Sequence, residues 1–189
     1  MGEGGGISVN RKELSEDFAL LSITIGKVMA AIGQTPIKTL DRETQDQLIL
    51  LGSIIQVGAG AALIDLASNN PSKQLGLALT VIGYGSFVLQ FIRDEDDDRI
   101  LLKRAISSNL KEVLASFVVA TDPIFWRKMY RIIGTLLVCI GNSIQVMGRN
   151  RLLTKGEDYT LFDHLVTFGT WMEAGGSAIL TLGTIDETL

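Results

Sequence analysis

Glycine recurs at seven-residue intervals inside several apolar segments of this chain. The two longest series contain three glycines each: Gly134, Gly141 and Gly148, and Gly169, Gly176 and Gly183. Seven residues are close to two turns of an α-helix, so each series would form a smooth strip along one helix face. Because glycine has no side chain, a second helix can approach such a strip closely. The spacing therefore predicts helix packing rather than chemistry.

Glycine inside a helix costs about 0.8–1.0 kcal/mol per residue relative to alanine. The chain contains 20 glycines, so close packing must offset a large loss of helix propensity. That packing can come from the same bundle, from a second copy of the chain, or from neighbouring helices in a membrane. The candidate packing or interface residues are Gly52, Gly76, Gly83, Gly134, Gly141, Gly148, Gly169, Gly176 and Gly183.

Six apolar segments carry helical features, and no strand is expected. The predicted helices cover residues 14–33, 41–67, 71–92, 100–120, 123–148 and 159–184. Asn70 before Pro71, and Asp122 before Pro123, are typical of helix starts. We therefore predict an all-α fold of about six helices, closely packed through glycine heptad faces.

The six helices are predicted to form two related three-helix units within one compact domain. The units cover residues 14–92 and 100–189, a flexible glycine-rich arm covers 1–13, and an acidic linker covers 93–99. One similarity does not fit a simple duplication, because residues 52–63 align without gaps to residues 169–180 and so pair the second helix with the sixth. Several repeats of one helical motif explain this better than two exact halves.

Charge and cysteine content limit the partners and the compartment. The net charge is −4, whereas proteins that bind nucleic acid usually present a basic face, so no nucleic-acid partner is expected. Cys139 is the only cysteine, which rules out a disulfide within the chain and favours an intracellular, cytoplasmic protein.

We find no catalytic constellation in the sequence, so the protein is predicted not to be an enzyme, and no cofactor is expected. His164 is the only histidine and has no convincing catalytic partner. Asp94, Asp96 and Asp98 form a weak candidate for a metal site, but they lack the spacing of a calcium-binding loop. A solvated linker explains this acidic run better, and no metal site is predicted.

Segment length, polar residues and charge distribution bear on whether the helices lie in water or in a membrane. Residues 48–64, 75–92 and 132–148 are apolar but only just long enough to span a bilayer. The polar residues inside apolar segments would be costly in lipid, and they are Lys27, Gln56, Asn142, Gln145 and Glu173. The fourth segment is also highly charged, and lysines and arginines divide almost evenly between alternate connections, contrary to the positive-inside rule. We therefore favour a bundle in water, with a membrane location as the alternative.

Three phrases with related apolar, glycine and amide residues resemble the repeats of small proteins from spore-forming Bacillus-type bacteria. These phrases are residues 140–148, residues 32–36 and residues 51–58. The resemblance implies expression in a sporulating cell or on a spore, but no activity and no functional residue.

Two functions are compatible with this pattern. The first is a non-enzymatic structural protein that self-associates through its glycine-lined helix faces, with itself as partner, into an oligomer or larger assembly. The alternative is a membrane-active or membrane-embedded protein whose helices pack through glycine.

Overall fold

The computed structural model describes residues 11–92, 97–123, 125–155 and 160–188. The described elements are α1 (Arg11–Gly33), α2 (Arg42–Leu66), α3 (Pro71–Ile92), α4 (Asp98–Val119), the short 3-10 helix η1 (Phe125–Arg127), α5 (Met129–Lys155) and α6 (Thr160–Thr188). The described part of the chain contains no strand, and the predicted all-α fold of six helices is confirmed.

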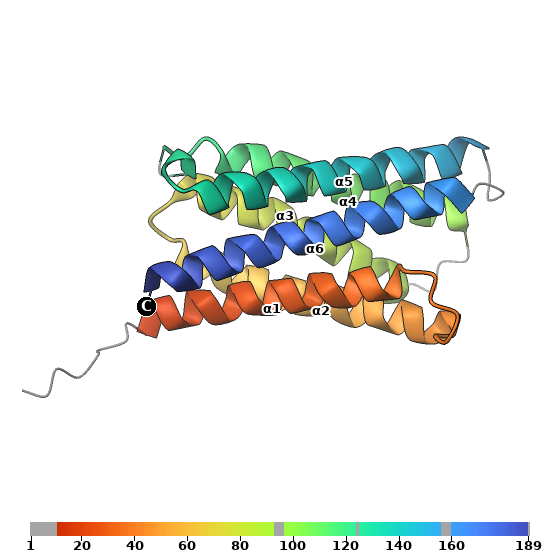
Figure 1. Ribbon diagram of the computed structural model, residues 1–189, viewed down its shortest axis with the longest axis horizontal. Coiled ribbons are helices and arrows are strands. Elements are labelled where there is room, and N and C mark those ends of the chain that lie inside the picture. The colour runs from red at the N-terminus through yellow and green to blue at the C-terminus, as the bar shows by residue number, and fades with distance from the viewer. Residues whose placement is uncertain (1–10, 93–96, 124, 156–159, 189) are drawn as a thin grey trace, which may run out of the picture.

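The six helices pack as a ring that follows the order of the chain. Each helix contacts the next one, and α6 returns to contact α1. Figure 1 shows the helix axes running roughly side by side, with the end of α6 next to the beginning of α1. The ends of the helices therefore lie at the two ends of an elongated bundle, whose long sides are formed by helix surfaces.

Several helix boundaries differ from the predicted ones. Helix α1 begins at Arg11, so the last three residues of the expected arm are helical, while residues 1–10 lie outside the described part of the chain. Helix α5 begins at Met129 rather than after Pro123, because the buried Phe125 side chain is part of the intervening 3-10 turn. It also continues past Gly148 to Lys155, so the predicted end of this helix is wrong.

The glycines meet backbone of the next helix within the same chain. A Cβ added at Gly141 would lie 2.5 Å from the carbonyl oxygen of Gly169, and one added at Gly169 would lie equally close to Gly141. Gly134 and Gly176 face each other across the same α5–α6 pair in the same way, at 2.8 and 2.6 Å. No side chain fits at these positions without moving the partner helix.

Comparable contacts join the other two helix pairs. Gly26 and Gly52 face each other between α1 and α2. Between α3 and α4, Gly76 lies close to the carbonyl oxygen of Ala115, and Gly83 lies close to that of Ser108. A Cβ at Gly183 would overlap the Tyr130 ring, and Gly148 is buried. The closest packing thus forms three hairpins, α1–α2, α3–α4 and α5–α6, and the aligned segments 52–63 and 169–180 lie in the second helix of the first and last hairpins. The division into two three-helix units stays a prediction.

A polar interior as candidate functional site

The interior of the ring is made mainly of small and polar side chains. Seven of the eleven buried hydrophobic residues among those described are alanines, whereas fourteen buried residues are polar or charged. The largest fully buried side chains are Leu63, Gln56 and Asn142, two of which are amides. A conventional small cluster of Ala19, Ile23 and Leu63 lies between α1 and α2. Elsewhere the apolar core expected of a water-soluble bundle is replaced by hydrogen-bonding groups.

Four charged and phenolic side chains from four helices meet at the centre of the bundle. Lys27 on α1 donates from Nζ to Glu112 Oε2 on α4 at 3.1 Å, and it also forms an ion pair with Glu173 on α6. The Tyr84 hydroxyl on α3 lies 2.6 Å from Glu112 Oε2 and 2.8 Å from Glu173 Oε1. These four residues are each 4–8% exposed. We call them the central cluster.

Amide side chains and one arginine extend the central cluster into a closed circuit of hydrogen bonds. On one side, Asn142 Nδ2 donates to Glu112 at 3.4 Å and Asn109 Nδ2 donates to Asn142 at 2.6 Å. On the other side, Gln145 Nε2 donates to Glu173 Oε2 at 2.9 Å. Arg149 on α5 joins the two branches by donating to Asn109 and to Gln145. The circuit also balances two carboxylates against one ammonium and one guanidinium group, as buried charges require.

Two cavities lie along the bundle axis, and the central cluster separates them. The inner chamber has a cavity volume of about 40 Å³ and is lined by residues from all six helices. The vestibule, of about 220 Å³, extends to the end of the bundle at which α1 begins, where Glu16, Lys73 and Arg131 line it. Lys27 and Glu112 line both cavities. Their ion pair therefore forms the boundary between the inner chamber and the vestibule.

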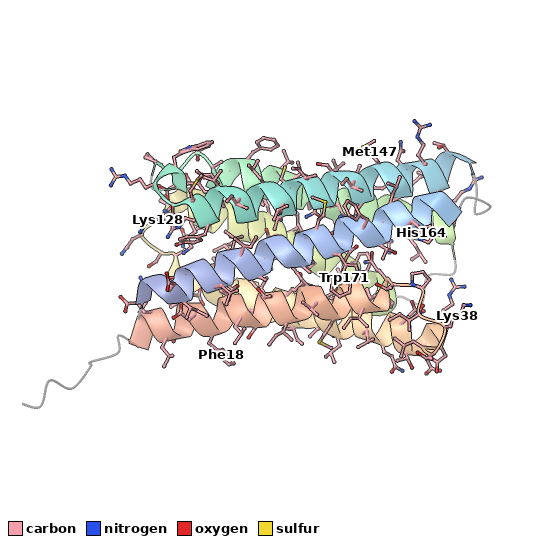
Figure 2. The ribbon with its side chains drawn as sticks, in the orientation of Figure 1. Phe18, Lys38, Lys128, Met147, His164 and Trp171 are labelled. Atoms are coloured by element: carbon pink, nitrogen blue, oxygen red, sulfur yellow. The ribbon has the colours of Figure 1, made fainter. Side chains whose placement is uncertain are left out.

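The outer surface of the bundle is apolar. Among the side chains that the structure describes, twenty-two large hydrophobic ones are exposed, and each of the six helices carries at least two of them. They follow heptad spacing, as in Leu14, Phe18, Leu21 and Ile25 on α1 and Met129, Ile133, Leu136, Ile140 and Met147 on α5. In Figure 2, Phe18 and Met147 project from the long sides of the bundle, whereas Lys38 and Lys128 lie at opposite ends. The distribution of polar and apolar side chains is thus the reverse of that in a water-soluble bundle.

The five polar residues that the sequence places inside apolar segments all lie in this interior. Four of them belong to the hydrogen-bonded circuit: Lys27, Asn142, Gln145 and Glu173. The fifth, Gln56, lines the inner chamber. The structure therefore removes the objection that these groups would face lipid if the helices crossed a membrane.

Sequence reasoning missed Tyr84, Glu112 and Arg149 as members of the site. Arg149 was assigned to a connection because the fifth helix was expected to end at Gly148. The available signal was spacing, since Arg149 follows Asn142 by seven residues and Gln145 by four, which gives one polar stripe along a helix. Asn109, Glu112 and Ser116 form a similar stripe on α4, and all three are buried.

The remaining sequence candidates are Asp94, Asp96, Asp98 and His164. Asp94 and Asp96 lie outside the described residues, as does the Asp98 side chain. Among the residues that the structure describes, no group of three His, Cys, Asp or Glu side chains is arranged to hold a metal ion. His164 is exposed near the start of α6, away from the labelled residues at the other end of the bundle (Figure 2).

The ring of six helices and its charged, hydrogen-bonded interior define the class: an all-α bundle that is polar inside and apolar outside. The chain belongs to a family of unknown function (DUF6944), which matches residues 16–181. The matched segment runs from the second turn of α1 to the last turns of α6 and so includes all six helices. No curated protein and no solved structure matches the chain.

Proposed function

We propose that this protein is embedded in a membrane, with the apolar outer surface in contact with lipid and the polar interior available to a polar solute. The observation that carries the proposal is the reversed distribution of side chains: buried charges and amides, and exposed leucine, isoleucine and phenylalanine on all six helices. In membrane proteins, ionisable residues within the spans face the bundle interior and pair with one another. The central cluster has both properties.

Helix length supports the same proposal. The six helices contain 22 to 29 residues, which corresponds to about 33–44 Å at 1.5 Å per residue, and a hydrocarbon core is about 30 Å thick. Two of them, Arg42–Leu66 and Met129–Thr154, are long and apolar enough to cross a membrane by composition alone. The core helix of a water-soluble protein can meet that criterion too, but such a helix is mostly buried. Here only 33% of each apolar window is buried.

Lys111 is the charged residue that fits this proposal least well. It lies in the middle of α4 and is only half-buried, and its ammonium group donates to Ser107 Oγ at 3.1 Å. Ser107 is one turn closer to the start of the helix, so the flexible side chain extends toward an end of the bundle. A lysine in a span commonly directs its ammonium group toward the membrane surface in this way.

The contact of the two tryptophans with lipid tests the proposal. Trp171 lies on the side of the bundle, on α6, and Trp126 lies at one end, in η1 (Figure 2 shows Trp171). In vesicles with brominated acyl chains, the Trp126→Phe variant should lose most of its fluorescence, because its remaining Trp171 contacts lipid. The Trp171→Phe variant should respond mainly to aqueous acrylamide. Release of the whole protein from cell membranes by alkaline carbonate would contradict the proposal.

Self-association through glycine faces stays a prediction, and only glycines that do not pack against their own chain can support it. Gly58 and Gly175 are exposed and Gly85 is half-buried, and all three have open space where a side chain would be, while Gly134, Gly141, Gly169 and Gly176 contact neighbouring helices of their own chain. Light scattering of the detergent-purified protein measures its mass. A mass above one chain that falls to one chain in the Gly58→Leu, Gly85→Leu or Gly175→Leu variant would support assembly through these positions.

A further inference from the structure

We infer that the inner chamber binds a small, uncharged, hydrogen-bonding solute of the polyol or urea type, which enters through the vestibule when the ion pair between Lys27 and Glu112 opens. This inference rests on the proposed membrane location.

The lining of the inner chamber indicates hydroxyl and amide chemistry. Its polar side chains include Gln34, Ser53, Gln56, Asn109, Gln145 and Thr170. Hydroxyl and carboxamide groups both donate and accept hydrogen bonds, so together they can replace the water around a solute that carries O–H or N–H groups. The structure also contains one acceptor that needs such a donor. Gln56 Oε1 has no hydrogen-bond partner, although Gln56 is only 2% exposed and lines the chamber.

The charge balance of the interior indicates a neutral solute. Glu112 and Glu173 are paired with Lys27, and the circuit through Gln145 and Asn109 reaches Arg149. Counted as formal charges, the two carboxyl groups are matched by one ammonium and one guanidinium group, so these side chains present no excess of one sign to attract an ion. An ion in the chamber would therefore be a buried charge without a partner, which costs several kcal/mol as an order of magnitude. A neutral hydrogen-bonding molecule avoids that cost.

The vestibule provides the route of entry. Its lining combines apolar side chains with hydroxyl groups, and two of these hydroxyl groups, on Ser177 and Thr181 of α6, lie 2.9 and 2.8 Å from Thr24 Oγ1 on α1. At its inner end the vestibule meets Lys27 and Glu112, which also line the chamber. Separation of this one pair would join the two cavities.

Solute flux into vesicles tests the inference. The full chain is reconstituted into liposomes, and the entry of glycerol and of urea is followed by stopped-flow light scattering. We expect faster entry of at least one of them than into protein-free vesicles, with no increase in potassium leakage. Gln56→Met keeps the size of the side chain but removes its polar atoms, and it should slow this entry about fivefold to tenfold, the effect of losing one hydrogen bond. Ser143→Ala is the matched control, because Ser143 bonds to its own helix and lines neither cavity.

A second variant tests the boundary between the cavities without unbalancing the charge. Lys27→Ala combined with Glu112→Ala removes the separating pair and leaves Glu173 with Arg149 as the remaining opposite charges. This double variant should raise the rate of solute entry above that of the unchanged protein. Flotation of the vesicles on a density gradient, run on every sample, shows whether the protein is in the membrane.

The outcomes separate the two proposals. Protein that fails to float with the vesicles overturns the membrane proposal itself. Protein that floats but gives no glycerol or urea entry above protein-free vesicles, or admits only water, overturns the inference about the solute and leaves the membrane location intact. Equal rates for Gln56→Met and the unchanged protein also overturn the assignment of the chamber as the solute site.

Discussion

At the scale of single residues, the central cluster determines how the interior is held together. Lys27 is the only cation that contacts both glutamates directly, and Tyr84 is the only hydroxyl group placed between them among the described residues. Charged groups in a low-dielectric interior are tolerated when they are paired, and are strongly destabilising when one partner is removed. The cluster therefore couples α1, α3, α4 and α6 through a small number of side chains.

Lys27→Met should destabilise the protein strongly because it leaves Glu112 and Glu173 close together without their cation. The expected loss is about 3–5 kcal/mol in the free energy of unfolding, as for other buried pairs that lose one partner. Denaturant unfolding in detergent micelles measures it. Lys38→Met, at an exposed position between α1 and α2, is the matched control and should unfold like the parent protein. Equal unfolding of both variants would show that the cluster does not hold the helices together.

Asp41 provides a pH-dependent contribution outside the polar interior. The backbone N–H of Thr44 donates to Asp41 Oδ1 at 2.7 Å, and this hydrogen bond holds the pKa of the Asp41 carboxyl below its usual value. Because the folded pKa is lowered, the stabilisation is complete above the unfolded pKa and is lost as the pH falls through the folded pKa.

Asp41→Asn keeps a capping oxygen but removes the charge. The parent protein should therefore melt at a higher temperature than this variant near neutral pH, and the difference should disappear in acid. Thermal melting of both proteins across the pH range measures this difference. A difference in melting temperature that is constant with pH would mean that the Asp41 charge contributes nothing to the start of α2.

At the scale of helices, two heptad stripes on the same element face different surroundings, because neighbouring residues are about 100° apart around a helix. On α5, Gly134 and Gly141 lie against α6, while Ile133 and Ile140, one residue earlier, are exposed. Because a seven-residue step returns to nearly the same face of a helix, both patterns persist over several turns. The sequence pattern predicted that glycine faces pack. The pattern could not tell whether a glycine face packs against a helix of the same chain or of another chain, because the face has the same residues in both cases.

Neighbouring glycines on α6 allow a matched test of this packing. A Cβ at Gly176 would lie 2.6 Å from the Gly134 carbonyl oxygen, whereas one at Gly175 would meet nothing within 4 Å. Gly175→Ala should raise stability by about 1 kcal/mol through helix propensity. Gly176→Ala should lower it by about 1–3 kcal/mol, because α5 and α6 must move apart. Thermal unfolding of the two variants measures both effects, and equal shifts would contradict the close α5–α6 contact.

At the scale of the whole molecule, helix number and helix class could be predicted from the sequence, but the inside and the outside of the bundle could not. Apolar periodicity and the cap at Asn70 locate helices because these are local signals, whereas Asp122 before Pro123 predicted a start for the fifth helix that lies instead at Met129. Burial is a property of the assembled ring. Each of Glu112 and Arg149 looks like a surface charge when its helix is considered alone. They become interior groups because other helices supply partners, Lys27 for Glu112 and the Asn109 amide for Arg149.

A charge on the outer face distinguishes lipid from water as the surrounding medium. Ile82 is 55% exposed near the middle of α3. Ile82→Lys would be almost neutral in water, but in a bilayer it should cost about 2.5–3.5 kcal/mol, the penalty for a lysine at the centre of a span. The measurement is the fraction of protein that stays in the membrane pellet after alkaline carbonate extraction.

Leu75→Lys is the control for depth in the membrane. Leu75 is 55% exposed as well but lies in the second turn of α3, close to the end of the bundle, so its lysine can reach the membrane surface. We expect more protein in the pellet for this variant than for Ile82→Lys. Equal and undiminished recovery of both variants would indicate that water, not lipid, surrounds the bundle.

Because α6 contacts α1, the ring of helices is closed, and the chain could begin at any of the three hairpins without changing their order around the ring. Because the end of α6 lies beside the beginning of α1 (Figure 1), a short linker between them would leave every helix with its two neighbours. A chain circularly permuted in this way, and opened instead between α2 and α3, would start with the α3–α4 hairpin. Its six helices should pack around the central cluster as before. The fold of this molecule therefore depends on which helices contact each other around the ring, and not on which helix comes first in the chain.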